Sequence, residues 1–253
     1  MDYYNYAFNP SDLTGGSVRS RRNAFFRKTH LTPQFFRGKK VLEIGPGEGW
    51  DILTMVKSGA RAVAGLDYSR GNVRNLRVKF RNYANVRVVR GDAIKLPFKA
   101  NQFDFVYANG AIPHVKDSLQ CLKEMVRVTR KGSIVWFSTY GKSGLNNYIN
   151  RIVRFLRLHI PIRFVMTELL QNKITKPILE KIFPTSNNRL FLEAIMTKYL
   201  HNLSERQLVS WCKDLGLIEI ERVFPNYGVE SSDNWLIKRL RSDWIQIKAK
   251  KSK

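Results

Sequence analysis

The stretch Val41-Leu42-Glu43-Ile44-Gly45-Pro46-Gly47-Glu48-Gly49-Trp50-Asp51 decides the fold of this chain. A short apolar strand passes into a glycine-rich turn and then into a helical pattern, which is how an open α/β sheet forms a nucleotide pocket. Glycine is needed where the backbone approaches a ligand closely or takes a positive φ, because no Cβ intervenes. The stretch therefore predicts a nucleoside or phosphate site where the first strand ends.

The composition is that of a basic, globular protein. The chain has 253 residues, 43% of them hydrophobic, so it can bury a core as one domain or as one domain with an insert. The 44 Lys and Arg against 20 Asp and Glu give a formal charge of +24. This excess favours a polyanionic partner such as nucleic acid or an anionic membrane surface. The alternative is a generally basic proteome or an adaptation to heat.

The two cysteines, Cys121 and Cys212, fall in helix-like patterns and form no cluster, so neither a disulfide framework nor a metal site is predicted. No apolar run approaches the ~20 residues that span a bilayer, and the amino end lacks the order of a secretion signal. These features predict a cytoplasmic protein without a transmembrane segment.

Strand and helix patterns alternate after the glycine turn. Buried strands are predicted at 40–44, 62–66, 85–90, 103–108 and 133–138, helices at 70–83 and 117–129, and two further strands at 217–224 and 244–250, with a short helix at 234–241 between them. The alternation predicts a doubly wound, mostly parallel α/β sheet of seven strands with right-handed crossovers.

Acidic residues follow two of these strands. Asp67 comes after the second strand, where its carboxylate can accept hydrogen bonds from both ribose hydroxyls of a nucleoside. Alternatively it caps the next helix, a role that Ser69 fits equally well. Asp92 follows the third strand within Gly91-Asp92-Ala93. The carboxyl edge of the sheet is therefore predicted to be acidic near the glycine turn.

Two segments outside this frame are assigned more broadly. Residues 1–38 are aromatic and basic; they are predicted to fold over the strand ends, with the aromatic side chains packed rather than stacked on bases. Residues 141–201 form a helical insert after the fifth strand, interpreted as a substrate-selecting lid, with membrane contact or plain packing as alternatives. The remaining ranges, 39–140 and 202–253, make up the main domain.

A stripe of arginines at 70, 74, 77 and 81 accompanies the apolar face of the helix at 70–83. Such a stripe is usually a solvated face. Given the basic excess, contact with phosphates is the competing interpretation.

The motifs together resemble the class I S-adenosylmethionine-dependent methyltransferases, and among them the methyltransferase type 11 group. The resemblance rests on Glu43 to Gly49, Asp67-Tyr68-Ser69, Gly91-Asp92-Ala93, and Phe103-Asp104-Phe105-Val106 followed by Asn109 and His114. It covers residues 38–140 well and 202–224 weakly. It implies an enzyme that uses S-adenosyl-L-methionine as its methyl donor.

The resemblance also implies roles for individual residues. Gly45, Gly47 and Gly49 would pass beneath the methionine part of the cofactor, and Glu43 would orient the turn or the amino group. Asp67 would bind the ribose, Tyr68 would pack on the adenine, and Asp92 with the Ala93 backbone would bind the adenine amino group. Asn109 and Gly110 would line the side of the fourth strand that faces cofactor and substrate.

A nicotinamide dinucleotide is the competing ligand for the same pocket. Its fingerprint requires glycine at the first, third and sixth positions of the turn, and the sixth position here is Trp50. The indole argues against a dinucleotide.

Catalysis is marked by one residue only. His114 follows the fourth strand and is the candidate general base, although it equally fits a residue that only shapes the pocket. Asn109-Gly110-Ala111-Ile112 lacks the Asn-Pro-Pro-Tyr pattern of exocyclic-amine methylases.

Three functions remain open. The first is methylation of a small or lipid-like acceptor, favoured by the resemblance. The second is methylation of RNA or a ribosome-associated protein, favoured by the charge of +24. The third is a non-catalytic module that binds the cofactor.

Overall fold

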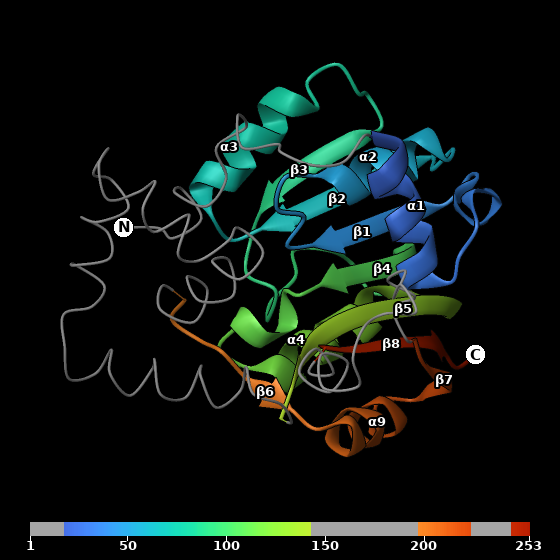
Figure 1. The fold of residues 1–253 in the computed structure, drawn as a ribbon, viewed down its shortest axis with the longest axis vertical. Helices are drawn as coiled ribbons and strands as arrows, with labels where there is room; N and C mark the ends of the chain where they lie inside the picture. Colours follow the sequence, from blue (N-terminus) through green and yellow to red (C-terminus); the bar gives the residue numbers. More distant parts are fainter. Residues whose placement is uncertain (1–17, 143–196, 224–243) are drawn as a thin grey trace, which may run out of the picture.

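The fold is a twisted sheet with helices on both faces (Figure 1). The computed structural model describes residues 18–142, 197–223 and 244–253. Within these ranges the strands are β1 (Lys40–Ile44), β2 (Ala62–Asp67), β3 (Val86–Arg90), β4 (Phe103–Asn109), β5 (Thr129–Gly141), β6 (Asn202–Leu203), β7 (Leu217–Arg222) and β8 (Trp244–Lys251). The helices are α1 (Val18–Thr29), α2 (Trp50–Lys57), α3 (Arg70–Lys79), α4 (Ser118–Val128) and α9 (Glu205–Asp214), with short 3-10 turns η3 (Pro33–Phe36) and η4 (Ile112–His114).

The strand order is β3-β2-β1-β4-β5-β8-β7, with the short β6 paired to β5. β8 runs antiparallel to both β5 and β7, and the other pairings are parallel. The predicted doubly wound, mostly parallel sheet is therefore confirmed, and the last two strands form an antiparallel pair. The chain builds outward from β1 to β3 and then returns to place β4 on the other side of β1. Ligands of open α/β sheets bind at such a reversal, outside the carboxyl ends of the strands.

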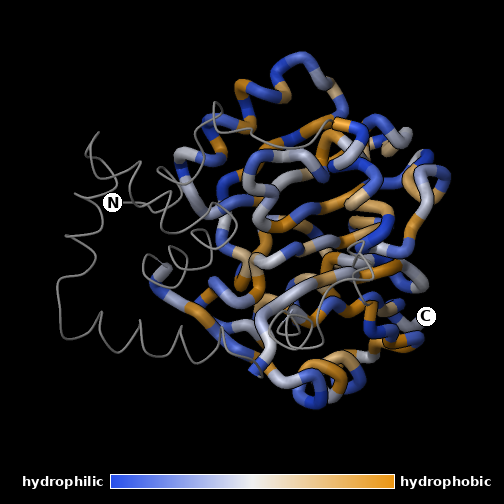
Figure 2. The backbone as a smooth tube through the Cα atoms, viewed as in Figure 1, coloured by the Kyte–Doolittle hydropathy of each residue, from blue (hydrophilic) through white to orange (hydrophobic). Residues whose placement is uncertain are grey.

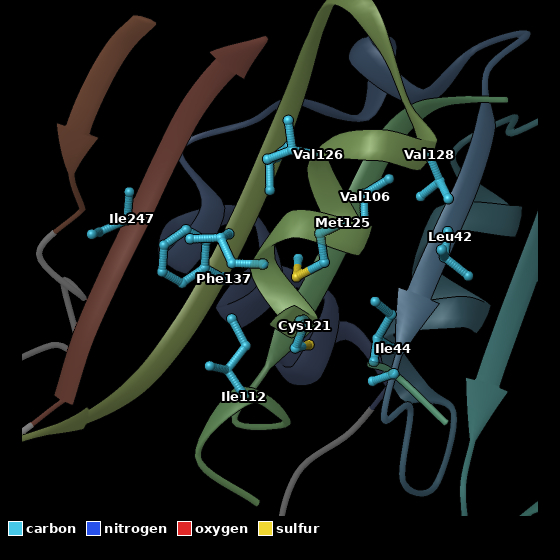
Figure 3. Packing of buried hydrophobic residues seen from close by; sticks show 14 of the residues in the cluster. Leu42, Ile44, Val106, Ile112, Cys121, Met125, Val126, Val128, Phe137 and Ile247 are labelled. Carbon is cyan, nitrogen blue, oxygen red and sulfur yellow. The ribbon is translucent and has the colours of Figure 1, made fainter. Parts of the chain in front are cut away.

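Two hydrophobic layers cover the two faces of the sheet. One face carries Val41, Phe105, Tyr107 and Trp136, packed against side chains of α1, α2 and α3. On the other face, residues of α4 and α9 join the alternate residues of the same strands. Figure 3 shows Cys121 and Met125 of α4 beside the strands on this second face. The central strands β1, β4 and β5 therefore bury apolar residues on both sides, as expected for strands between helical layers.

The helices begin where the sequence supplies side-chain caps. Ser69, Asp117 and Ser204 accept hydrogen bonds from the backbone amides of Asn72, Gln120 and Gln207 at the starts of α3, α4 and α9. The apolar faces of these helices turn inward, so hydrophobic and hydrophilic stretches alternate along them (Figure 2).

The predicted boundaries differ from the structure in a few places. The fifth strand begins at Thr129 rather than 133, because it follows α4 directly and passes through Gly132, whose φ of +72° accommodates an irregular register beside β4. α1 (Val18–Thr29) packs on the sheet face beside α2. The aromatic residues Phe25 and Phe36 are fully buried, which confirms packing for this part of the amino-terminal segment.

Several predictions lie outside the described residues. They include most of the helical insert at 141–201, the helix at 234–241 and the first 17 residues. The domain division stays a prediction. Within the described ranges, the helices are all too short or too polar to cross a bilayer.

Candidate functional site

The glycine turn lies at the carboxyl end of β1, between β2 and the loop after β4. Gly45 donates its amide to the carbonyl of Leu66 at 2.8 Å, and Gly49 donates to Pro46 at 2.8 Å. Both glycines have positive φ, +67° and +76°. A Cβ on Gly45 would lie 2.8 Å from the Cβ of Ala111. The turn is therefore compact, and it requires glycine for both conformation and space.

Gly49 has a second role, because a Cβ there would lie 2.7 Å from side-chain atoms of Leu76 and Phe80. It is thus the glycine that allows α3 to pack closely against the turn. Gly49 also precedes α2, and it offers no side chain to cap that helix. The first amides of α2 consequently face the turn without the side-chain cap that the helices α3, α4 and α9 have.

Trp50, at the sixth position of the turn, is contacted by one acidic and two basic side chains. Its indole N–H donates to Oε2 of Glu48 at 2.6 Å. The Lys79 ammonium lies 4.1 Å from the ring centroid, and the Arg21 guanidinium 4.7 Å. A dinucleotide fingerprint has glycine at the position of Trp50, where it allows the helix and strand to pack closely. In this protein close packing against α3 occurs at Gly49 instead, and the indole fills the sixth position. This geometry supports the sequence argument against a nicotinamide dinucleotide.

Glu43 is a buried carboxylate at the second-last position of β1. It is 3% exposed, and its Oε2 has no hydrogen-bond partner among the described residues. Burial raises the pKa of Glu43 well above its usual range; the charges of Asp51 and Asp67 raise it further, and Lys28 and the backbone amide of Ile52 lower it. A buried oxygen without a partner costs free energy, so its retention marks a place for a ligand group.

Asp67, predicted to bind ribose, is buried at the end of β2. Its two carboxylate oxygens accept hydrogen bonds from the Ser69 amide at 2.9 Å and from the Asn72 side chain at 3.2 Å. Ser69 itself caps α3, whereas Asp67 braces the turn that leads from β2 into that helix. Tyr68, next along the chain, is 64% exposed. It presents an uncovered ring beside the acid.

Asp92 and Ala93 follow β3 at the same edge of the sheet. Asp92 is exposed, and its Oδ1 accepts from the amide of Ile94 at 3.1 Å. Ala93 is buried in the core layer beneath. The acid is therefore held by its own turn and remains open to solvent.

Asn109 and Gly110 end β4 and are joined to β5 by one hydroxyl. Ser138 donates to the Asn109 side-chain oxygen at 2.9 Å and accepts from the Gly110 amide at 2.9 Å. Gly110 has φ +75°, and a Cβ there would lie 3.0 Å from the indole of Trp244. Ser138 thus holds Asn109 and Gly110 in place beside the indole of Trp244, and we call this pair the floor of the site.

His114 lies in η4, a few residues beyond this floor. Its Nδ1 donates to the carbonyl of Tyr199 at 3.3 Å, because a carbonyl can only accept. In the neutral ring this leaves the lone pair on Nε2. The ring packs edge-on against Tyr140, 5.8 Å between centroids, and Tyr140 packs edge-on against Trp244 at 4.8 Å.

A second histidine, His201, mirrors this contact. Its Nε2 donates to the Val115 carbonyl at 2.9 Å, and its backbone amide donates to Pro113 at 2.9 Å. Two imidazoles therefore join the segment containing Tyr199 and His201 to η4 and the residue after it: His114 bonds to the Tyr199 carbonyl, and His201 bonds to the Val115 carbonyl. The sequence analysis missed His201, Tyr140 and Trp244, because they come from separate segments that only the fold brings together.

Three further residues near Glu43 were also missed. Lys28 of α1 forms an ion pair with Asp51 at 2.7 Å, and the hydroxyl of Tyr107 donates to the same Asp51 oxygen at 2.7 Å. Asp51 closes the decisive stretch of sequence, so its place could have been noticed. Nothing in the sequence marks Lys28.

The carboxylates at this edge fit S-adenosylmethionine. The ligand combines a cationic sulfonium and amino group with a nucleoside. The edge offers the Glu43 oxygen that has no partner among the described residues, together with the acids Asp67 and Asp92, around a glycine-rich turn. Among the described residues, no group of three or more His, Cys, Asp or Glu could hold a metal ion.

Comparisons with known proteins point the same way. Residues 42–137 match the family model described as a methyltransferase domain. The demethylmenaquinone methyltransferase of Geobacillus stearothermophilus is 38% identical over 128 residues, which cover 49% of this chain and 55% of that protein. Its Staphylococcus aureus (strain MRSA252) counterpart is 37% identical over 101 residues, covering 39% and 42%. The chain thus spans about half the length of these curated relatives.

Solved structures share the fold at low identity. An S-adenosylmethionine-dependent methyltransferase from Mesorhizobium loti gives a TM-score of 0.61 at 15% identity, covering 93% of this chain and all of that one. The YcgJ protein of Bacillus subtilis gives 0.58 at 16% identity, covering 92% and 98%. The family match, the strand order and these likenesses agree. Residues 42–137 of this chain match a methyltransferase domain, and the chain shares its fold with the S-adenosylmethionine-dependent methyltransferase from Mesorhizobium loti.

Proposed function

We propose that this chain is an S-adenosylmethionine-dependent methyltransferase acting on a small or lipid-like acceptor with a flat ring. The observation that carries the proposal is Glu43, whose buried carboxylate lies beside the glycine turn with one oxygen that no described residue hydrogen-bonds. A cationic amino group would satisfy that oxygen and offset the burial of the charge.

The remaining cofactor roles follow from the placement of the residues. The turn of Gly45, Gly47 and Gly49 would pass beneath the methionine part, Asp67 would accept from the ribose, and the exposed ring of Tyr68 would cover the adenine. Asp92 and the Ala93 amide would bind the adenine edge. When bound, the cofactor supplies an electrophilic methyl group for an in-line displacement, so the task of the protein is mainly to hold the acceptor in line.

The acceptor would lie over Asn109 and Gly110, against Tyr140 and Trp244. Edge-on aromatic rings beside a glycine floor suit a planar ring better than a flexible chain. The named relatives are demethylmenaquinone methyltransferases, whose name specifies a quinone acceptor. A quinol-like ring is therefore the first acceptor to test.

His114 would take the proton of the acceptor. The Tyr199 carbonyl fixes the proton on Nδ1, which leaves the basic electron pair on Nε2. A general base of this kind typically contributes about 10² to 10⁴-fold to the rate when the acceptor is an alcohol or phenol.

The test is incubation with methyl-labelled cofactor and separated RNA, protein, lipid and small-metabolite fractions, followed by a panel of phenols and quinols. We expect label in the lipid or small-metabolite fraction, and turnover lowered at least tenfold by His114→Ala. His30→Ala is the matched control, because His30 is an exposed residue paired with Glu221 of the edge strand β7. Full turnover in His114→Ala would show that His114 is not the general base.

The second candidate is methylation of RNA. It is favoured by residues 68–91, which include seven Arg and Lys and no acid. The arginines at 70, 74, 77, 81, 87 and 90 are exposed, on α3, on the turn after it and on β3. Arginine without neighbouring acids suits a phosphate backbone. Label confined to RNA, with affinity for bulk tRNA that falls steeply with salt, would favour this candidate. Cofactor binding without label in any fraction would leave only a binding module.

A further inference from the structure

The amino-terminal helix contributes a charge to the cofactor site. α1 packs beside α2 on the sheet face (Figure 1), and its Lys28 reaches Asp51 in the first turn of α2. The Lys28 and Asp51 side chains are only 15% and 17% exposed, and their N–O distance is 2.7 Å. The pair is therefore shielded from solvent, where an ion pair matters more than it does at the surface.

Tyr107 ties this pair to β4. Its hydroxyl donates to the same Asp51 oxygen at 2.7 Å, and the Lys28 ammonium lies 5.4 Å from its ring centroid. Tyr107 is the direct neighbour of Glu43 in the register of β1 and β4. Adjacent residues of parallel strands point to the same face, so Glu43, Tyr107 and Asp51 share one buried space.

This space contains more negative than positive charge. Glu43 on β1, Asp51 on α2 and Asp67 on β2 are acidic, Tyr107 on β4 is neutral, and Lys28 on α1 is the cation that bears on them. Burial raises the pKa of Glu43, and Asp51 raises it most among the charges, whereas Lys28 lowers it. Removing the cation would therefore leave Asp51 uncompensated beside Glu43.

We propose that Lys28 is a positioning residue that sets the charge of the amino-group subsite: by holding Asp51 together with Tyr107, it allows Glu43 to carry a negative charge for the cationic group of the ligand. The proposal rests on the proposed function for the identity of that ligand. Glu43 touches the cofactor, and Lys28 acts through Asp51. The amino-terminal segment is in this way part of the binding site as well as of the core.

The first experiment follows the Glu43 carboxyl in the ligand-free protein, by carbon NMR of glutamate-labelled samples across pH, with Glu43→Gln to assign the signal. We expect Lys28→Met to move the midpoint of Glu43 upward by about one pH unit or more, the usual effect of losing a nearby opposite charge. Lys28→Arg, which keeps the charge, should stay near the native midpoint. Asp51→Asn should move it downward, because Asp51 raises the pKa of Glu43.

The second experiment titrates S-adenosylhomocysteine, which retains the amino group, by calorimetry near pH 7. Lys28→Met should weaken binding about tenfold, and the double variant Lys28→Met/Asp51→Asn should recover most of that loss, since the uncompensated acid is removed with the cation. A loss in both the single and the double variant would indicate a packing role and overturn the proposal.

The outcomes separate the two levels of the argument. If S-adenosylhomocysteine does not bind the native protein, the proposed function fails, while the ligand-free titration still tests Lys28. If Lys28→Met folds, by its circular dichroism, and leaves the midpoint of Glu43 unchanged, the proposal is wrong. If Lys28→Met does not fold, Asp51→Asn carries the test, and an unchanged midpoint in that variant overturns the proposal as well.

Discussion

The two edges of the sheet treat buried acids in opposite ways. At the amino edge, Asp104 on β4 accepts hydrogen bonds from the Lys40 amide, at 2.7 Å, and from Arg130. At the carboxyl edge, Glu43 has an oxygen with no partner among the described residues. Burial would raise the pKa of both acids, but the Lys40 amide and the Arg130 guanidinium outweigh it and hold the pKa of Asp104 below its usual value. The acid at the amino edge stabilises the fold through its hydrogen bonds, whereas the acid at the carboxyl edge keeps an oxygen that a ligand group can satisfy.

The glycines differ between the edges in the same way. Gly49 and Gly132 both have positive φ, but a Cβ on Gly49 would overlap Leu76 and Phe80, whereas nothing lies within 4 Å of a Cβ on Gly132. Gly49→Ala should therefore destabilise the protein by about 2–4 kcal/mol, from strain and overpacking together. Gly132→Ala, with strain alone, should cost about 1 kcal/mol. Urea unfolding of both variants measures the difference, and equal losses would show that the turn tolerates a side chain.

Glu43→Gln tests the incomplete edge directly. We expect affinity for S-adenosylhomocysteine to fall by about tenfold to a hundredfold, the scale of a charged hydrogen bond. The same variant should unfold at a higher temperature than the native protein, because an unpartnered buried charge is removed. Calorimetric titration and thermal unfolding check the two effects. Unchanged binding would remove Glu43 from the site.

Asp104→Asn should give the reverse pattern. It removes the charge that pairs with Arg130, so stability should fall by about 1–2 kcal/mol, a figure reduced for the partial exposure of Arg130. Binding of S-adenosylhomocysteine should stay within twofold of the native value, since Asp104 lies at the other edge. A large loss of affinity at unchanged stability would contradict the division between the edges.

The smallest expected effect is in the pH dependence of stability. The pKa of Glu43 is raised by folding, so its contribution falls as pH increases from the unfolded value of about 4.3 towards the folded one. The pKa of Asp104 is lowered, so its contribution is present above about 3.9 and is lost as pH falls towards the folded value.

Urea unfolding at several pH values measures these contributions. The stability gain of Glu43→Gln should shrink by about 1 kcal/mol or more on going from pH 7 to pH 4, where Glu43 is protonated in both states. The loss in Asp104→Asn should persist at pH 5 and shrink only below about pH 4. A gain that stays constant from pH 7 to pH 4 would mean that Glu43 is not the titrating acid.

The predicted elements that fall within the described residues were recovered because their signals are local. Period-two and near-continuous apolar runs identified β1 to β4, and the cap Ser69 lies where α3 begins. β6 was not foreseen, because two residues carry no periodicity. The start of β5 was placed four residues late, because Lys131 and Gly132 suggested a break that the strand in fact passes through.

The candidate site was predicted unevenly for the same reason. The glycines, Asp67 and Asp92 each follow a strand within a few residues, and position along the chain was enough to find them. His114 was found, but its partners Tyr199 and Tyr140 were not, because they come from other segments. The cofactor roles of all these residues remain proposals.

The sequence alone determined the alternation of strands and helices, the glycine turn and the acids at the strand ends, because backbone sterics and periodicity act over a few residues. The tertiary structure decided which acids are satisfied. Lys28 meets Asp51 across 23 positions and Tyr107 meets it across 56, whereas Glu43 keeps an unpartnered oxygen. Charge balance in a buried space depends on side chains brought together from distant segments, and only packing sets it.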